Sequence, residues 1–271
     1  MTRWIANARM YGVAPAAEAA WQILLARVAG AAQVQLDYMP YPAPQPLEAL
    51  WARPDLGCVL MCGYPVALQM AAVTPVAAPI PSASSAMGRA VYRTDFIVRK
   101  DSGFATLADT FTGRFGWTVR HSHSGFNAPR HHLLRYRKPG QTQLFASAAR
   151  DLVTARRVLD AVVAGEIDVG PLDAYWHALL ALHRPDLVDA IRVVESTDVA
   201  PLPAFVASAS MPPDMLAGLR QAFVDAAQAP WFAALARPLA ISGFAAVTLA
   251  DYATTLHWEK AAVVAGYLLP E

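Results

Sequence analysis

The chain has 271 residues and a mass of 29.1 kDa, enough for one large domain or two small ones. Hydrophobic residues make up 55% of it and charged residues 16%, a composition that excludes an intrinsically disordered chain. Lys and Arg total 22 against 21 Asp and Glu, so there is no basic excess to indicate nucleic-acid binding. Every apolar stretch is interrupted before about 18 residues, so we expect no membrane insertion.

The first ninety residues alternate strand-like and helix-like segments, as α/β proteins do. The predicted strands cover 4–9, 34–38 and 58–62, and the predicted helices begin at about 14 and 47. Residues 75–85 contain three prolines, which lack the backbone donor, and are expected to be extended or looping. Cys58 and Cys62 lie four residues apart on one strand, roughly 13 Å, and are predicted to be buried thiols rather than a disulfide.

The alternation resumes in the second half of the chain. Strands are predicted at 92–99, 114–120, 167–170 and 191–194, and helices at 124–136, 151–164, 173–182, 215–227, 231–236 and 249–265. Residues 201–203 form an extended crossing. We therefore predict two lobes, each a mainly parallel sheet flanked by helices, with residues 1–92 plus 202–271 in lobe 1 and residues 93–201 in lobe 2.

The segment from Arg120 to Arg130 follows a predicted strand and opens a helix. Ser124 is a plausible N-cap, and a helix that begins after a strand's carboxyl end offers unpaired N–H groups to an anion. The hydroxyls of Ser122 and Ser124 add neutral donors, and Gly125 lets a ligand approach the backbone closely. The alternative interpretation is an ordinary serine cap without a ligand.

Four histidines lie in or next to this segment, at positions 121, 123, 131 and 132, and could in principle bind a metal ion. Their spacing is unfavourable for a metal site. His131 and His132 are adjacent, so on a helix they point about 100° apart, whereas zinc needs three or four convergent ligands. We expect neither a metal nor a cofactor. His123 is interpreted as a possible donor to a ligand, and His121 as a surface or capping residue.

Further candidates also follow predicted strands. Asp173 comes after the strand that ends at Gly170, and Tyr11 and Tyr64 follow two strands of the first half. Ligands of open α/β sheets bind at such carboxyl ends. Asp173 can equally be a helix N-cap, and each tyrosine can be a core residue. No Gly-x-Ser-x-Gly elbow, Gly-x-Gly-x-x-Gly motif or P-loop is present.

Three segments in this order are similar to a known family: residues 92–103, Ser122-His123-Ser124-Gly125, and residues 165–173. The chain resembles the phosphate-, phosphite- and phosphonate-type substrate-binding proteins of ABC transporters, which have the type II periplasmic binding protein fold. The resemblance implies two α/β lobes that close by hinge bending on a ligand in the cleft between them. It implies that Ser122, Ser124 and Gly125 hold the anionic head group, that Tyr11 and Tyr64 line the wall of the other lobe, and that Asp173 contacts the remainder of the ligand.

Two features depart from this family. A Gly/Ser-His pair usually opens the helix before the Gly-Glu-x-Asp strand, whereas residues 153–157 contain no histidine. The chain also begins without the pattern of a signal peptide or a lipobox cysteine. The first departure leaves the choice between phosphonate and another small anion open, and the second leaves a cytoplasmic location open. From the resemblance we expect a non-enzymatic, periplasmic binding protein for a small anion, with an ABC transporter permease as its partner. The alternative is a cytoplasmic transferase or hydrolase acting on a phosphorylated metabolite.

Overall fold

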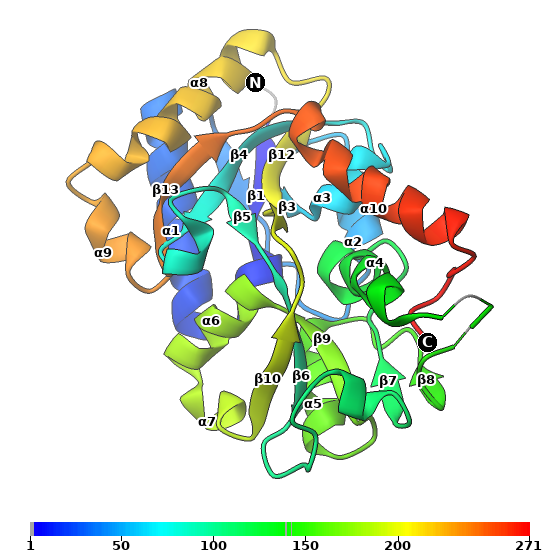
Figure 1. Cartoon of the computed structure of the whole chain (residues 1–271). Helices are drawn as coiled ribbons and strands as arrows, with labels where there is room; N and C mark the ends of the chain where they lie inside the picture. Colours follow the sequence, from blue (N-terminus) through cyan, green and yellow to red (C-terminus); the bar gives the residue numbers. More distant parts are fainter. Residues whose placement is uncertain (1–2, 139, 142) are drawn as a thin grey trace. The chain divides into compact units, whose positions relative to one another are not determined.

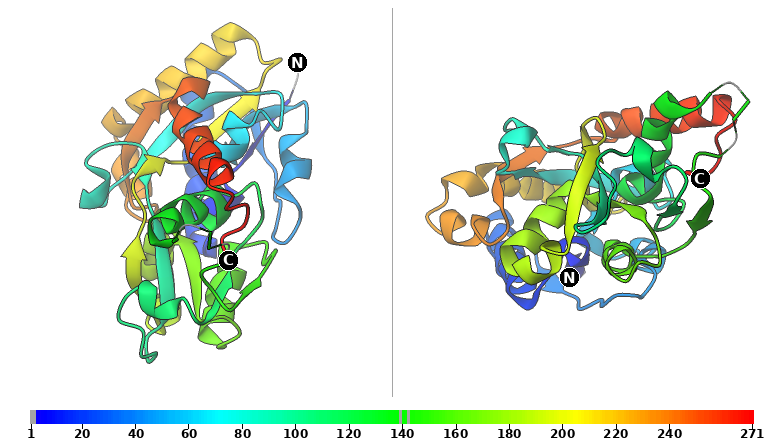
Figure 2. Two further views of the ribbon diagram at one scale, coloured as in Figure 1. Left: turned by 45° about the vertical axis from the view of Figure 1, so that its right-hand side comes forward. Right: turned by 60° about the horizontal axis from the view of Figure 1, so that its bottom comes forward.

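The computed structural model describes residues 3–138, 140–141 and 143–271, and the chain divides into two compact α/β units (Figures 1 and 2). The first unit comprises Met1–Tyr92 and Pro201–Ala253, and the second comprises Arg93–Ala200 and Thr254–Glu271. Among the described residues, no helix is long and apolar enough to cross a membrane.

The first unit is built on a six-stranded sheet with the order β13-β4-β12-β3-β1-β2. These strands are β1 (Trp4–Asn7), β2 (Leu36–Tyr38), β3 (Leu56–Met61), β4 (Val73–Pro81), β12 (Ala204–Ser208) and β13 (Ile241–Ala246). Three helices, α1 (Pro15–Ala32), α8 (Pro213–Asp225) and α9 (Phe232–Ala236), contact one another or the strands. The fully buried rings of Trp21, Phe205 and Phe223 pack between them.

Strand β4 carries Pro75, Pro79 and Pro81 although it lies inside the sheet. Its first half, residues 73–77, pairs with β12, and its second half, residues 77–81, pairs with β13. Each half of β4 therefore hydrogen-bonds to a neighbouring strand on one side only. A proline, which lacks an N–H, is tolerated where its nitrogen faces the unpaired side. The prolines predicted an extended segment, and this division explains how that segment becomes a strand.

The second unit is built on a five-stranded sheet with the order β10-β6-β9-β7-β8. Its strands are β6 (Thr94–Arg99), β7 (Arg114–Gly116), β8 (Ser147–Ala149), β9 (Val169–Asp173) and β10 (Ile191–Ser196). Its helices include α4 (Ala128–Leu133), α5 (Ala155–Val163), α6 (Ala174–His183) and α7 (Pro185–Val188). Phe96, Phe115 and Trp117, all fully buried, form the centre of its core.

Both sheets are mixed, which corrects the expectation of mainly parallel sheets. Strands β1, β2 and β3 pair in parallel, as do β7, β8 and β9. The first strand after each passage of the chain into a unit, β6 and later β12, runs antiparallel to both of its neighbours. A third sheet pairs two short strands at these passages, β5 (Val91–Tyr92) and β11 (Ala200–Pro201).

The C-terminal segment belongs to the second unit, whereas the sequence prediction placed all of residues 202–271 in lobe 1. Its helix α10 (Ala253–Val264) is followed by Tyr267, which is buried in the core of the second unit. The carbonyl of Glu271 accepts hydrogen bonds from Leu144 N and Tyr267 Oη, at 2.7 and 2.8 Å. The apolar pattern of a helix does not reveal which of two cores it covers, so the sequence could not show this third passage between the units.

Candidate functional site

The serine-containing segment forms a wide helical turn after β7. A π-helical turn, η4 (His123–Asn127), runs directly into α4. Ser122 is its N-cap: Ser122 Oγ accepts the Gly125 N–H at 3.0 Å, and the Ser122 carbonyl accepts the Asn127 N–H at 3.0 Å. The predicted N-cap at Ser124 is therefore wrong, because the i→i+5 turn starts two residues earlier and places Ser124 within it, half-buried.

Gly125 lies where no side chain fits. A Cβ atom at this position would lie 2.0 Å from Thr118 Oγ1 and 2.9 Å from Ser122 Oγ. Thr118 is buried, and its Oγ1 has no hydrogen-bond partner among the residues that the structure describes. The turn thus brings two hydroxyls and the Gly125 backbone together. Thr118 was not predicted as a site residue, because it lies four residues before Ser122 and belongs to no recognisable sequence motif.

His123 is buried and held in the neutral form. Burial, aided by the nearby His131, lowers the pKa of His123 to about 3. Asn127 Nδ2 lies 3.3 Å from His123 Nδ1, and since an amide N–H donates, Nδ1 accepts and the ring proton resides on Nε2. At neutral pH, His123 therefore supplies no positive charge to the turn.

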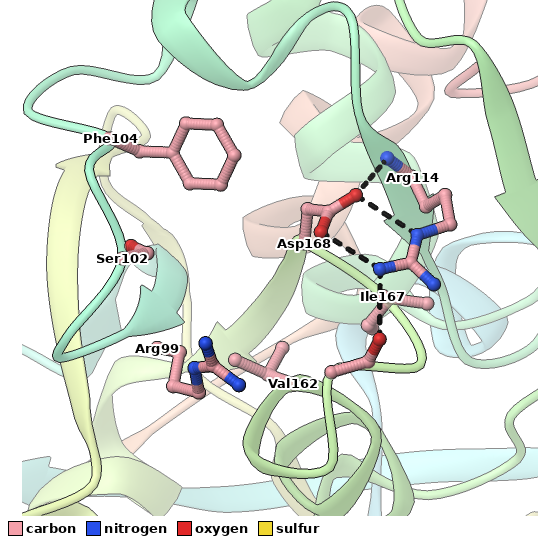
Figure 3. A pocket seen from close by; sticks show the side chains of 8 residues that line it. Arg99, Ser102, Phe104, Arg114, Val162, Ile167 and Asp168 are labelled. Atoms are coloured by element: carbon pink, nitrogen blue, oxygen red, sulfur yellow. Dashed lines mark hydrogen bonds and ion pairs between the residues drawn. The ribbon is translucent and has the colours of Figure 1, made fainter.

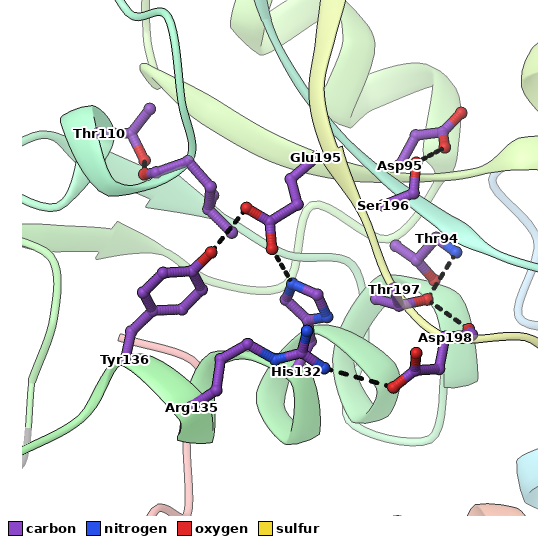
Figure 4. Close-up of polar contacts among 11 residues, drawn as sticks. Thr94, Asp95, Thr110, His132, Arg135, Tyr136, Glu195, Ser196, Thr197 and Asp198 are labelled. Carbon is purple, nitrogen blue, oxygen red and sulfur yellow. Dashed lines mark hydrogen bonds and ion pairs between the residues drawn. The ribbon is translucent and has the colours of Figure 1, made fainter.

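Side chains of α4 and of the 3₁₀ turn that follows it (Leu134–Tyr136) contact β10 and the residues just after β10 (Figure 4). His132 Nε2 lies 2.5 Å from Glu195 Oε1, and Tyr136 Oη donates to Glu195 Oε2 at 2.7 Å. Arg135 pairs with Asp198 at 3.3 Å. Burial lowers the pKa of His132, opposed by its contact with Glu195. These contacts fix α4, and with it the turn at its start.

Asp173 lies at the same edge of the sheet as the turn. It ends β9, the parallel neighbour of β7, and β9 contacts the η4 turn. Asp173 Oδ1 accepts the N–H groups of Tyr175 and Trp176, at 2.9 and 3.0 Å, so this carboxylate is the N-cap of α6. Capping by one oxygen and contact of the carboxylate with a ligand are compatible, as the sequence prediction allowed.

Tyr11 and Tyr64 lie in the first unit, after the carboxyl ends of the adjacent parallel strands β1 and β3. Tyr11 ends a short 3₁₀ turn that contacts β3, and Tyr64 lies in the short helix α3 (Gly63–Ala67). Both side chains are buried, with exposed fractions of 1% and 4%. Their role toward a ligand stays a prediction.

Neither Cys58 nor Cys62 is part of a disulfide, and both thiols are buried. Among the residues that the structure describes, no group of three or more His, Cys, Asp or Glu side chains is arranged to hold a metal ion. His131 stacks on Trp258 with ring centroids 4.8 Å apart, while the adjacent His132 faces Glu195. At the start of α5, where members of the family usually carry a histidine, Thr154 caps the helix: its hydroxyl accepts the Arg157 N–H at 3.1 Å.

A separate pocket of about 180 Å³ lies at the opposite, amino-terminal end of β9 (Figure 3). Arg114 lines it and is fixed by Asp168, which accepts from Arg114 Nη2 and Nε at 3.0 and 3.1 Å. The contact with the Arg114 guanidinium lowers the pKa of Asp168. Asp168 therefore has a structural role, and this pocket contains none of the predicted site residues.

Comparisons with known proteins identify the family and support the fold. Residues 14–252 match the family described as "ABC transporter, phosphonate, periplasmic substrate-binding protein". No curated protein sequence matches the chain.

Similar solved structures share the fold at low identity. One is a binding-protein component of an ABC phosphonate transporter from Pseudomonas aeruginosa, with a TM-score of 0.77, 16% identity, and coverage of 97% of this chain and 88% of that chain. Another is PhnD1 from Prochlorococcus marinus in complex with methylphosphonate, with a TM-score of 0.78, 12% identity, and coverage of 96% and 98%. A Xanthomonas citri protein bound to ATP has a TM-score of 0.67, 18% identity, and coverage of 98% of each chain.

The family match spans most of the chain, and the similar solved structures share its fold. The chain belongs to the family of periplasmic substrate-binding proteins of phosphonate ABC transporters.

Proposed function

We propose that this protein binds the oxyanion head group of a phosphonate or phosphate-like solute at the turn formed by residues 122–127, and that it delivers the solute to an ABC transporter permease. The observation that carries the proposal is the turn itself. It follows the carboxyl end of a parallel strand, opens a helix, and gathers the hydroxyls of Thr118 and Ser122 at a glycine that no other residue can replace without a clash.

Neutral groups would provide the binding. The first N–H groups of a helix have no partner within the helix and lie at its positive end, so they favour an anion. Ser122 Oγ already accepts the Gly125 N–H, so its own proton is available for donation to a ligand oxygen. His123 stays neutral, so recognition would depend on oriented dipoles and not on a cation of this residue.

The part of the ligand outside the head group would be contacted by Asp173 and by Tyr11 and Tyr64 of the first unit. A carboxylate next to an anion-binding turn disfavours a second negative charge and favours a ligand with an amino or hydroxyl group. Solute delivery to a permease places the protein in the periplasm, as in its family.

Calorimetric titration tests the proposal with methylphosphonate, phosphate, sulfate, acetate and ATP as probes. We expect a phosphorus oxyanion to bind to the wild-type protein. Ser124→Ala removes a hydroxyl of the same turn and leaves the Ser122 cap in place, and it should weaken the affinity roughly 10- to 100-fold, the effect of one hydrogen bond to a charged group. Ser147→Ala, which removes an exposed hydroxyl on β8, is the matched control. Unchanged affinity in Ser124→Ala, or binding of none of the phosphorus compounds, would refute the assignment.

A further inference from the structure

The third passage of the chain between the units starts from a firm anchor in the first unit. Tyr252 ends the short 3₁₀ helix η7 (Leu249–Tyr252) and is completely buried. Its ring packs on Gly63, where a Cβ atom would lie 2.4 Å from Tyr252 Cδ1, and its hydroxyl donates to the Leu202 carbonyl at 3.1 Å. Gly63 immediately precedes Tyr64 at the start of α3, so this anchor holds the helix that carries one of the predicted ligand contacts.

The passage ends on an equally firm anchor in the second unit. Asn127, the last residue of the η4 turn, is fully buried and donates from Nδ2 to the Thr255 carbonyl at 2.8 Å. One turn of α10 later, the Trp258 ring stacks on both His123 and His131, with centroids 5.2 and 4.8 Å apart. Helix α10 is therefore attached directly to the candidate anion-binding turn and to its continuation in α4.

Only two residues, Ala253 and Thr254, separate the two anchors along the chain. Three residue steps span at most about 11 Å, so the Cα atoms of Tyr252 and Thr255 stay within that distance in every arrangement of the two units. We propose that residues 252–258 act as a short tether that limits how far the anion-binding turn can move from the start of α3, with Asn127 and Trp258 as the positioning residues that hold the turn to the tether.

This tether has a consequence for affinity, which rests on the proposed function. A solute that contacts both the turn and Tyr64 must hold these two parts of the chain in fixed positions. A short connection between them reduces the conformational entropy that is lost on binding. Lengthening it from 3 to 9 or 15 residue steps should weaken affinity by at most about 5-fold and 11-fold, from the three-halves power of the length ratio. These values are upper limits because the passages at residues 92/93 and 200/201 still join the units.

Inserting 6 or 12 Gly/Ser residues between Ala253 and Thr254 tests the tether without changing a side chain of either anchor. The control inserts the same segments between the half-buried Ser102 and the exposed Gly103, at a bend of the second unit where Gly103 has no neighbour within 4 Å of a Cβ position. Calorimetric titration with methylphosphonate should show a loss of affinity that increases with the length of the insertion at 253/254 and is absent in the control. Equal losses at both sites, or none, would overturn the proposal.

A second readout needs no ligand and separates this inference from the proposed function. Spin labels on Gln228→Cys in the first unit and Ala181→Cys in the second occupy exposed positions, and the two native thiols are buried. The insertions at 253/254 should broaden the distribution of label-to-label distances, the longer one more, and the control insertions should not. An unchanged distribution refutes the tether. A wild-type chain that binds no phosphorus oxyanion refutes the proposed function. The distance distributions alone then decide whether residues 252–258 act as a tether.

Discussion

The buried His123 makes the stability of the second unit depend on pH in a way that can be calculated. The unfolded chain binds a proton on this residue below about pH 6.5, whereas burial lowers its pKa in the folded protein to about 3. Between these values the unfolded state binds more protons, so stability is complete above pH 6.5 and is lost as the pH falls below it. From pH 7 to pH 5, His123 should account for a loss of about 2 kcal/mol in the free energy of unfolding.

Urea unfolding of the wild-type protein and of His123→Leu, at pH 7 and at pH 5, measures this contribution. The substitution also changes packing against Trp258, but that change is common to both pH values and cancels in the difference between them. The wild-type protein should lose about 2 kcal/mol more than the variant on acidification. His257→Gln, an exposed histidine of the same helix, is the control and should behave as wild type. Equal losses in the wild type and His123→Leu would show that His123 is not held neutral.

Two further predictions concern the site directly. Gly125→Ala forces a methyl group against Thr118 Oγ1 and should destabilise the protein by about 1–3 kcal/mol and abolish oxyanion binding, whereas Gly30→Ala, in open space on α1, should be neutral or stabilising in thermal unfolding. Asp173→Ala should lower the free energy of unfolding by about 1 kcal/mol, because the N-cap of α6 is lost. Asp173→Ser should keep the cap and change only the affinity for the ligand. Unaltered affinity in Asp173→Ser would show that this carboxylate is not part of the site.

The sequence predicted most helices and most of the strands, because their apolar patterns are local. It missed β8, β12 and β13, which are short or alanine-rich and are defined by their partners in the sheets. Residues 151–154, predicted to be helical, instead include Asp151 and Val153 with positive φ values of 55° and 64°. The helix begins only after Thr154, whose hydroxyl caps it.

The candidate site was predicted in part because strand-to-turn junctions carry recognisable residues. Ser122, Gly125 and Asp173 were selected by their positions after strands, and the structure places these junctions of the second unit at one sheet edge. The N-cap was misassigned since a π-helical turn has no sequence signature distinct from that of an α-helix. Thr118 and Trp258 were missed because their proximity to the turn depends on folding, and Trp258 is 135 residues away from His123 along the chain.

The central claim is that the turn of residues 122–127 holds the head group. A crystal structure of the complex with methylphosphonate tests it most directly. We expect phosphonate oxygens within about 3 Å of backbone N–H groups of this turn and of the hydroxyls of Ser122 and Ser124. A phosphonate bound elsewhere, with these groups more than 4 Å away, would contradict it.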